Sequence, residues 1–442
     1  MHPLATPKTY RVKSFGCQMN VYDGERMGEL LSAQGLAPAP EGEEAELVVL
    51  NTCHIREKAT EKVYSDIGRL VKGGRKAGRQ PMIAVAGCVA QAEGEEIMAR
   101  APAVSMVVGP QAYHRLPEML DRAVAGERAT DTDMPAIAKF AALPERRKIG
   151  PAAFLTVQEG CDKFCTYCVV PYTRGTEISR PWDDIVAEAR ALVEVGAREI
   201  VLLGQNVNAW SGSGRGLADL IREIAAIDGL ERIRYTTSHP ADMSAALIAA
   251  HGEIDKLMPY LHLPVQSGSD RLLRAMNRSH SVESYLDTIE KVRAARPDIA
   301  ISGDFIVGFP GETEEDFEVL LDWLGEAKLD RVGCFRFEPV AGAAANALPD
   351  PVPPEVKEER WHRLMQAQQP ISARNLAKKI GRRVPVILDE TSGRTAKGRS
   401  MWDAPEIDGE VHLRDAGYLE QGDIVEILVE DADEHDLYGV PR

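Results

Sequence analysis

The sequence predicts an α/β protein in three parts: a doubly wound parallel sheet, a partial (βα)6 barrel, and a small antiparallel β-barrel at the C-terminal end. Three observations predict this fold class. Short apolar runs alternate with amphipathic stretches over residues 8–125, the same alternation restarts at Phe154, and residues 379–442 contain only short strand-like runs. Alternating strand and helix patterns are typical of parallel sheets, whereas strands without intervening helices favour a small antiparallel barrel.

The first part, residues 8–125, contains four apolar runs that we expect to be parallel strands. They are Tyr10–Phe15, Leu47–Leu50, Met82–Ala86 and Ser105–Val108, with helical patterns at Gly24–Leu31 and Arg56–Val71. Residues 126–150 are rich in Ala, Pro and charge, including Met134-Pro135 and Glu145–Lys148. Such a composition is typical of a linker.

The second part, residues 151–378, contains six further runs that alternate with helical patterns. They are Phe154–Val157, Glu199–Leu203, Ile233–Thr236, Tyr260–Pro264, Ile299–Val307 and Val332–Phe337. Six such units predict a barrel or part-barrel whose chemistry lies at the C-terminal ends of its strands. A long helix, Pro354–Ile380, leads to the third part, residues 379–442. Its expected strands are Val384–Leu388, Glu410–Leu413 and Ile424–Val429.

The composition of the chain limits which classes of protein it can belong to. The 442 residues carry a net charge of −16 and include seven cysteines. No apolar stretch approaches 18 residues and residues 1–10 lack a secretory signal, so we expect no membrane span and a cytoplasmic location. Thiols stay reduced there, and clustered cysteines are then more often metal ligands or nucleophiles than disulfides. The negative charge weakly disfavours broad nucleic-acid binding, because phosphate contacts need Lys and Arg.

Three cysteines, Cys161, Cys165 and Cys168, stand on one loop directly after the first strand of the predicted barrel. Thiolates at this spacing can hold three irons of a cubane cluster and leave the fourth iron without a protein ligand. The amino and carboxylate groups of a methionine moiety would suit that open iron. A zinc knuckle is the alternative, but it needs a fourth ligand nearby, and no histidine follows within forty residues.

Three other cysteines are far apart in sequence, yet each follows a predicted parallel strand. Cys17, Cys53 and Cys88 come just after the first, second and third strands of the sheet. In a doubly wound sheet those strand ends share one edge, where ligands bind, so three thiols would converge on one site and could hold a second cluster. The alternative is three buried cysteines that pack as small apolar residues. Cys334 lies inside a strand and is most simply a core residue.

The run Cys161-Asp-Lys-Phe-Cys165-Thr-Tyr167-Cys168 resembles the signature of the radical S-adenosylmethionine enzymes, which carry an aromatic residue beside the last cysteine. The resemblance implies a 4Fe-4S cluster on Cys161, Cys165 and Cys168 that donates an electron to S-adenosylmethionine and cleaves it to a radical. It also implies that Tyr167 lies close to the bound cofactor.

Two glycine-containing stretches at later strand ends, 262–268 and 303–313, fit the same family. Glycines there would let the backbone approach a bound nucleoside, as we expect at Gly308. Gln266 and Asp304 would bond the polar edges of that nucleoside. Arg174 follows the cysteine loop closely and is a candidate for contacting the cofactor or an anionic substrate, with a surface salt bridge as the alternative.

Motifs around the first three cysteines make the resemblance more specific. Phe15-Gly-Cys17-Gln-Met-Asn20, Asn51-Thr-Cys53-His-Ile-Arg56 and Ala86-Gly-Cys88 resemble the N-terminal domain of the methylthiotransferases, and residues 379–442 resemble a TRAM domain. The resemblance implies a second 4Fe-4S cluster on these cysteines that presents a sulfur atom, which one S-adenosylmethionine methylates. The radical from a second S-adenosylmethionine then removes hydrogen from an unactivated C–H, and the carbon takes the methylthio group. A reducing partner such as a flavodoxin or ferredoxin, and a sulfur donor, are implied as well.

The resemblance divides between two branches of this family. Residues 8 to about 305 resemble the branch that modifies isopentenyl-adenosine beside the tRNA anticodon, including Leu203-Gly-Gln205-Asn206. From about Ile306 the sequence resembles the branch that modifies an aspartate of a ribosomal protein, because Val340–Asn346 stands where the tRNA branch carries an arginine-containing Pro-Gly-Thr-Pro turn. The chain therefore reads as a mosaic of the two.

The charge of the C-terminal part also bears on whether the substrate is a tRNA or a ribosomal protein. Residues 385–442 contain five Lys and Arg against fifteen Asp and Glu. An acidic domain repels phosphate and attracts basic protein, although excess acid also serves solubility. We expect tRNA adenosine methylthiolation at the anticodon stem-loop, with the aspartate of a basic ribosomal protein as the alternative. A non-enzymatic iron–sulfur RNA-binding protein is a third hypothesis, and it predicts no cleavage of S-adenosylmethionine.

Overall fold

The computed structural model describes residues 5–54, 57–134, 138–146, 150–405 and 408–442. Ile55 and Arg56 of the second cysteine motif lie outside the described residues, as do Pro135 and residues 147–149 of the expected linker. Contacts divide the chain into two compact units. The first contains Met1–Arg146, Glu159–Ile178 and Glu338–Asn346, and the second contains Arg147–Gln158, Ser179–Phe337 and Ala347–Arg442.

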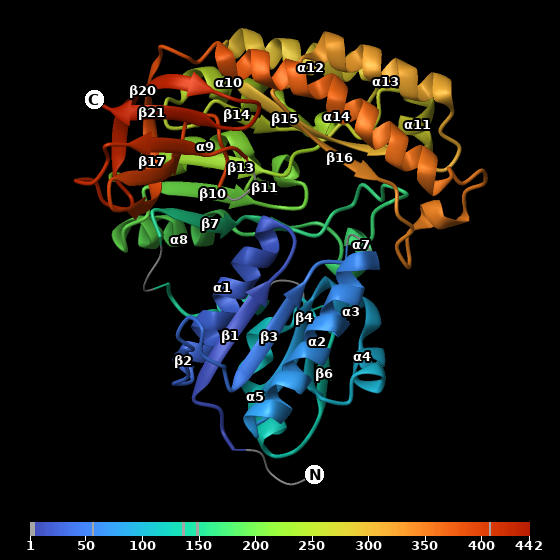
Figure 1. The fold of residues 1–442 in the computed structure, drawn as a ribbon, viewed down its shortest axis with the longest axis vertical. Helices are drawn as coiled ribbons and strands as arrows, with labels where there is room; N and C mark the ends of the chain where they lie inside the picture. Colours follow the sequence, from blue (N-terminus) through green and yellow to red (C-terminus); the bar gives the residue numbers. More distant parts are fainter. Residues whose placement is uncertain (1–4, 55–56, 135–137, 147–149, 406–407) are drawn as a thin grey trace. The chain divides into compact units, whose positions relative to one another are not determined.

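A six-stranded parallel sheet forms the centre of the first unit (Figure 1). Its strands, in the order β2-β1-β3-β4-β5-β6, are β1 (Thr9–Ser14), β2 (Ala37–Pro38), β3 (Leu47–Thr52), β4 (Met82–Gly87), β5 (Val104–Val108) and β6 (Ala129–Asp131). The expected parallel sheet is confirmed. The sequence did not predict β2 or β6, which are only two and three residues long, and β6 lies within the expected linker.

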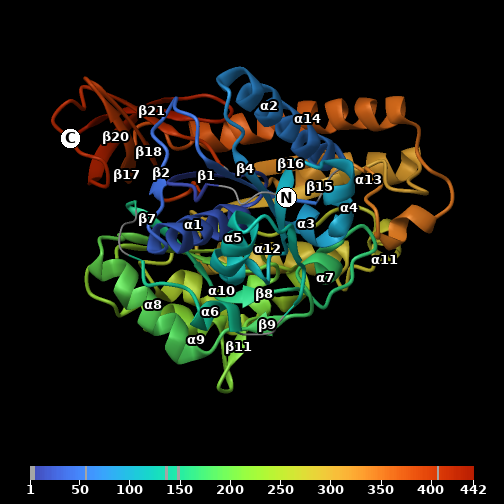
Figure 2. The same ribbon diagram turned by 90° about the horizontal axis from the view of Figure 1, so that it is seen from below.

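Helices cover both faces of this sheet, as Figure 2 shows for α1 and α5 on one side and α2, α3 and α4 on the other. The helices of the first unit are α1 (Gln18–Ala33), α2 (Glu57–Ala77), α3 (Cys88–Glu93), α4 (Glu95–Arg100), α5 (Leu116–Val124), α6 (Ala138–Ala141) and α7 (Val170–Thr173). Alternate residues of β3 serve the two layers: Leu47 and Val49 belong to one apolar core, and Val48 and Leu50 to the other. The uninterrupted apolar run of β3 follows from burial on both faces.

Six parallel strands form the part-barrel of the second unit, which confirms the expected architecture. They are β7 (Ala152–Thr156), β10 (Glu199–Leu203), β13 (Arg232–Thr236), β14 (Tyr260–His262), β15 (Ala300–Val307) and β16 (Arg331–Arg336). They pair as two three-stranded sheets, β13-β10-β7 and β14-β15-β16, and a parallel bridge joins Ile233 of β13 to Leu257 just before β14.

The helices of the second unit follow these strands. They are α8 (Trp182–Glu194), α9 (Leu217–Ala225), α10 (Ala245–Glu253), α11 (Asp270–Ala275), α12 (Val282–Ala295), α13 (Glu314–Ala327) and α14 (Pro354–Ala377). A large apolar core lies between strands and helices, where the rings of Tyr285, Phe305 and Trp323 pack edge to face. Cys334 is buried in this core, as the sequence predicts. Two-residue strands, β8 (Gln158–Glu159), β9 (Ile178–Ser179), β11 (Ser211–Gly212) and β12 (Arg215–Gly216), complete the connections.

Helix α14 runs beside β16 and leads into a closed five-stranded barrel, drawn in red in Figure 1. Its strands, in the order β17-β18-β19-β21-β20, are β17 (Arg383–Ser392), β18 (Thr395–Arg399), β19 (Val411–Arg414), β20 (Ile424–Ala432) and β21 (Leu437–Pro441). The expected small barrel is confirmed. The sequence missed β18 and β21 because the first is mostly polar and the second ends in proline. Among the described residues, no helix is both long and apolar enough to cross a bilayer.

Candidate functional site

Cys17, Cys53 and Cys88 lie at the C-terminal ends of three neighbouring strands, as the sequence predicts. Cys17 follows β1 and caps α1, Cys53 follows β3, and Cys88 is the first residue of α3 after β4. The strand order reverses between β1 and β3, because β2 lies outside β1. Ligands bind in open α/β sheets at such a reversal, outside the carboxyl ends of the strands. The topology thus brings three distant cysteines to the usual ligand-binding edge.

Two of these thiols are in contact. A Cβ on Gly16, whose φ is +105°, would lie 2.5 Å from the Cβ of Cys53, so only glycine lets the chain pass there. A hydrogen bond from Cys53 lowers the pKa of Cys17 to about 6, with the charge of Arg174 adding to the effect and burial opposing it. Burial raises the pKa of Cys88, which is partly offset by Arg174. The lowered pKa favours the thiolate form of Cys17, which is the form that binds metals.

The loop with Cys161, Cys165 and Cys168 belongs to the same compact unit as the other three cysteines. The backbone N–H of Cys168 donates to the carbonyl of Cys165 at 2.9 Å, and the N–H of Val170 donates to the Cys168 sulfur at 3.5 Å. Burial raises the pKa of Cys161 to about 11. Tyr167 is half-buried on this loop, and the ring of exposed Phe164 packs edge to face on Tyr172.

The segment Glu338–Asn346 packs against both cysteine regions of this unit. The N–H of Ala345 donates to the carbonyl of Thr166 at 2.7 Å, and Val340 and Ala343 form an apolar cluster with Val169. The backbone at Ala341 also bonds to His54, the neighbour of Cys53. The segment that departs from the tRNA-branch turn is thus placed beside both sets of cysteines.

Arg174 is buried and does not form a surface salt bridge, so that alternative is wrong. Its side chain is 2% exposed, and Nη2 donates to Asp23 Oδ2 at 2.6 Å and to Asn20 Oδ1 at 2.9 Å. Both acceptors lie on α1, the helix that begins after Cys17. Arg174 thus lies with the second set of cysteines, although it follows the first set in sequence.

Gln266, Asp304 and Gly308 belong to the second unit: Gln266 follows β14, Asp304 lies within β15 rather than at its end, and Gly308 directly follows β15. Gln266 has φ +79°, and its backbone bonds to β15 through N–H to Asp304 O at 2.8 Å. A positive φ at a non-glycine residue is uncommon and clusters at ligand sites. Asp304 lies 3.6 Å from His262, and a Cβ on Gly333 would lie 2.4 Å from Asp304 Oδ1. The glycine of β16 therefore makes room for this carboxylate.

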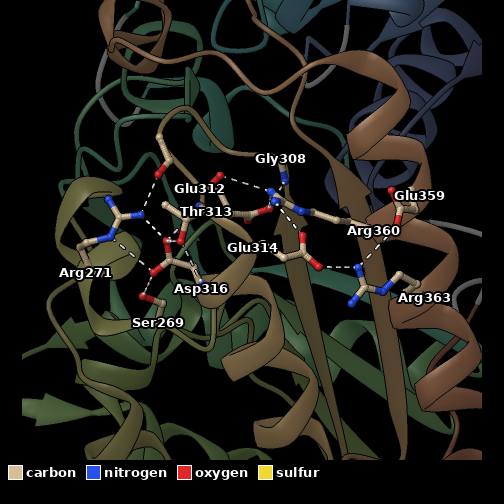
Figure 3. Close-up of polar contacts among 11 residues, drawn as sticks. Ser269, Arg271, Gly308, Glu312, Thr313, Glu314, Asp316, Glu359, Arg360 and Arg363 are labelled. Carbon is tan, nitrogen blue, oxygen red and sulfur yellow. Dashed lines mark hydrogen bonds and ion pairs between the residues drawn. The ribbon is translucent and has the colours of Figure 1, made fainter.

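The loop after β15 is held by one buried carboxylate, shown in Figure 3. Glu312 Oε1 accepts from the N–H of Gly308 at 2.8 Å and from Nη1 of Arg360 on α14 at 2.7 Å. Gly308 has φ +72°, and a Cβ there would lie 2.3 Å from Cγ of Lys357. The shape of this glycine loop is therefore set by packing against α14. Burial raises the pKa of Glu312, which Gly308 and Arg360 partly offset.

We expect Glu312→Gln to lower stability by about 1–2 kcal/mol, because the buried ion pair with Arg360 is lost and the hydrogen bond from the N–H of Gly308 becomes a neutral one. Thermal unfolding followed by circular dichroism measures the change. The matched control is Glu318→Gln, which removes an exposed carboxylate of α13 that pairs with Arg363. Equal midpoints for the two variants would show that the buried pair does not stabilise the loop.

Sequence reasoning missed two polar side chains at the ends of β10 and β13. Among the described residues, Asn206 Oδ1 and Ser238 Oγ are buried and have no hydrogen-bond partner. Asn206 also donates to Asp242 at 2.8 Å, which fixes its orientation. Buried polar atoms are normally bonded, so two orphaned ones at barrel strand ends indicate a ligand site. The signal in the sequence was a polar residue shortly after each strand.

The donor set fits iron–sulfur clusters. The structure describes no group of three Cys, His, Asp or Glu side chains close enough to share a single metal ion. A cubane cluster has no such requirement, because each thiolate binds a different iron and the three thiolates stand farther apart. Cys17 has a lowered pKa and the cation Arg174 as a neighbour, and the N–H of Val170 donates to the sulfur of Cys168. Iron–sulfur clusters use contacts of these kinds.

Comparison with known proteins gives three family matches along the chain. The description Radical SAM superfamily matches residues 155–324, Uncharacterized protein family UPF0004 matches residues 9–109, and TRAM domain matches residues 380–441. The tRNA-2-methylthio-N(6)-dimethylallyladenosine synthase of Erythrobacter litoralis is 61% identical, over 99% of this chain and 98% of its own. The synthase of the same name from Novosphingobium aromaticivorans is 58% identical over 98% of both.

The chain belongs to the tRNA-2-methylthio-N(6)-dimethylallyladenosine synthase family. It is a radical S-adenosylmethionine methylthiotransferase, and its family implies S-adenosylmethionine and a 4Fe-4S cluster as cofactors. Because the match to these synthases continues through the C-terminal part, the mosaic interpretation is not needed and the ribosomal-protein alternative is not favoured.

Solved structures support the fold alone. The radical S-adenosylmethionine methyltransferase TsrM from Kitasatospora setae matches with a TM-score of 0.55 at 12% identity, over 76% of this chain and 77% of that one. The cobalamin-dependent radical enzyme OxsB matches with a TM-score of 0.52 at 13% identity, over 83% and 56%.

Proposed function

We propose that this methylthiotransferase inserts a methylthio group at C2 of isopentenyl-adenosine next to the tRNA anticodon. The observation that supports this most is the pair of cysteine triads in one compact unit, in a chain that matches such synthases from end to end. A single triad would serve a radical enzyme without sulfur transfer. A second triad provides a separate place for the sulfur.

In this proposal, Cys161, Cys165 and Cys168 hold the cluster that binds S-adenosylmethionine, with Tyr167 beside it. Cys17, Cys53 and Cys88 hold a second 4Fe-4S cluster. When bound, these groups supply the hydrogen-abstracting radical chemistry and the sulfur atom that is transferred. The protein binds and orients them and keeps water out.

The remaining residues position the nucleoside of the cofactor. Gln266 after β14 and Asp304 within β15 offer an amide and a carboxylate, and Asn206 and Ser238 offer buried polar atoms that need partners. The loop at Gly308, fixed by Glu312, closes the same end of β15. Specific hydrogen bonds to a bound nucleoside would satisfy these groups and select it over analogues.

The C-terminal barrel is proposed to contact the tRNA. It exposes the rings of Tyr418 and Tyr438, and unpaired bases stack on exposed aromatic side chains. Part of the acidic charge of this barrel is paired within it, as in Arg414–Glu430 at 2.7 Å and Lys397–Glu410 at 2.9 Å. A flavodoxin or ferredoxin as reductant, a separate sulfur donor and a cytoplasmic location complete the proposal.

The experiment is to incubate the reconstituted enzyme with S-adenosylmethionine, a reductant and an anticodon stem-loop that contains isopentenyl-adenosine. Mass spectrometry of the digested RNA is expected to show one added methylthio group. The same stem-loop with plain adenosine is the control and is expected to react far less. A basic ribosomal protein is tested in parallel, and modification of that protein alone would contradict the proposal.

A further inference from the structure

Arg174 lies in a buried network of charges that joins the cysteine loop to the sheet of the first unit. Lys139 donates to both carboxylate oxygens of Glu159, at 2.5 and 2.6 Å, and Gln111 donates to the same carboxylate at 2.6 Å. Arg174 pairs with Asp23, and neither side chain is more than 2% exposed. The network thus holds two cations and two carboxylates away from water.

One arm of the Arg174 guanidinium makes no hydrogen bond within this network. Nη2 carries the bonds to Asp23 and Asn20, whereas Nη1 is buried, forms only a longer ion pair with Glu159 at 3.8 Å, and has no nitrogen or oxygen acceptor at hydrogen-bond distance among the described residues. A buried N–H group without a partner costs about 1–3 kcal/mol. The chain tolerates this cost, which indicates that a bound group accepts the hydrogen bond.

The free arm belongs to the side of Arg174 where the second set of cysteines lies. The Arg174 side chain lies within hydrogen-bond reach of the Cys88 thiol. Asn20 and Asp23, which hold the other arm, are three and six residues after Cys17 on the same helix. The guanidinium is thereby oriented by α1 toward the thiols at its N-terminal end.

We propose that Arg174 is a positioning residue for the second cluster, donating a hydrogen bond from Nη1 to a cluster sulfur or to its Cys88 ligand. The inference rests on the proposed second cluster and goes beyond it. Three thiolates give a cluster net negative charge, and a permanently charged guanidinium offsets that charge. Hydrogen bonds to sulfur raise the reduction potential of iron–sulfur clusters. Arg174 directly follows α7, just after the loop of Cys161, Cys165 and Cys168, and its side chain bonds to α1, which begins after Cys17. This one residue therefore links the two cysteine regions.

The experiment measures the midpoint potential of the second cluster by itself. In the Cys161→Ala/Cys165→Ala/Cys168→Ala background, reconstituted protein is assayed for iron and sulfide and then titrated potentiometrically with electron paramagnetic resonance detection. Arg174→Gln is expected to shift the midpoint to more negative potential, and Arg174→Lys by less, because it keeps the charge but loses the forked geometry. Arg115→Gln, a partly exposed arginine that pairs with Asp131, is the matched control.

Asp23→Asn separates this role from a structural one. It breaks the same ion pair as Arg174→Gln, so a purely structural effect would move both variants in the same direction. If Arg174 acts on the cluster, loss of the Asp23 carboxylate shifts the midpoint to more positive potential, opposite to Arg174→Gln. If Arg174→Gln does not retain iron, the midpoint potentials of Arg174→Lys and Asp23→Asn are compared instead.

Two outcomes would overturn the inference, and they differ. A background protein without iron and sulfide would overturn the second cluster and, with it, the role of Arg174. A full complement of iron and sulfide with an unchanged midpoint in the Arg174 variants would overturn only the role of Arg174 and leave the proposed function intact.

Discussion

Replacing Cys161, Cys165 and Cys168 by alanine is expected to abolish cleavage of S-adenosylmethionine, whereas the same replacement of Cys17, Cys53 and Cys88 leaves cleavage and abolishes methylthio transfer. The reason is that, in the proposed function, one triad would hold the iron that binds the cofactor and the other the sulfur that is transferred. Each triple variant is expected to retain about half of the iron and sulfide, because the proposed function assigns one cubane cluster to each triad.

Liquid chromatography of 5′-deoxyadenosine under reducing conditions measures cleavage, and mass spectrometry of the stem-loop measures transfer. Cys334→Ala is the matched control, because this cysteine lies on β16, is buried in the apolar core of the second unit, and belongs to neither triad. It is expected to retain iron and both activities. Loss of cleavage in the Cys17, Cys53 and Cys88 variant at full iron content of the other triad would show that the two sites do not act separately.

Replacing Glu199 by glutamine is expected to destabilise the attachment of the C-terminal barrel to the part-barrel by about 3–5 kcal/mol. Glu199 begins β10 and is fully buried among three arginines: Arg399 at 2.5 Å, Arg234 at 3.4 Å and Arg232 at 3.8 Å. Arg399 belongs to β18, so this cluster spans the two parts of the second unit. Removing the central anion leaves buried cations without their shared partner.

The same arginines bond to the main chain of the C-terminal barrel. Arg232 donates to the carbonyls of Pro385 and Arg399, at 2.9 and 3.1 Å, and Arg234 donates to those of Ser400 and Met401, at 3.0 and 3.1 Å. Glu199 thus neutralises the side chains that dock the barrel. Burial opposes ionisation, but Arg399, Arg234 and Arg232 outweigh it and lower the pKa of Glu199 to about 2.

The lowered pKa sets the sign of the pH dependence. The stabilisation by Glu199 is complete above its unfolded pKa of 4.5 and is lost as the pH falls toward 2. Hydrogen exchange of strands β17–β21, followed by mass spectrometry at neutral pH, measures the effect of Glu199→Gln. Glu231→Gln, an exposed carboxylate that pairs with Arg198, is the control. Equal exchange in both variants would contradict the role of the buried cluster.

Local features of the sequence were enough to predict much of the site. Cys161, Cys165 and Cys168 sit on one loop, so their spacing alone brings three thiols together. The apolar runs of β3 and β4 identified buried parallel strands, and the position of Cys53 and Cys88 after them indicated a shared edge. Short strands such as β2 and β6 escaped prediction, because two or three residues carry no periodic pattern.

The sequence by itself predicted the fold class, the loop of Cys161, Cys165 and Cys168, and a resemblance to the methylthiotransferases, because these follow from periodicity, spacing and motifs that neighbouring residues carry. Only the tertiary structure decided the roles of Arg174, Glu199 and Glu312. The acceptors of Arg174 on α1 are about 150 residues away in sequence, and Arg399 lies 200 residues from Glu199. Whether a charged side chain is solvated or buried depends on which distant groups surround it, and the free energy of a buried charge is set by those partners.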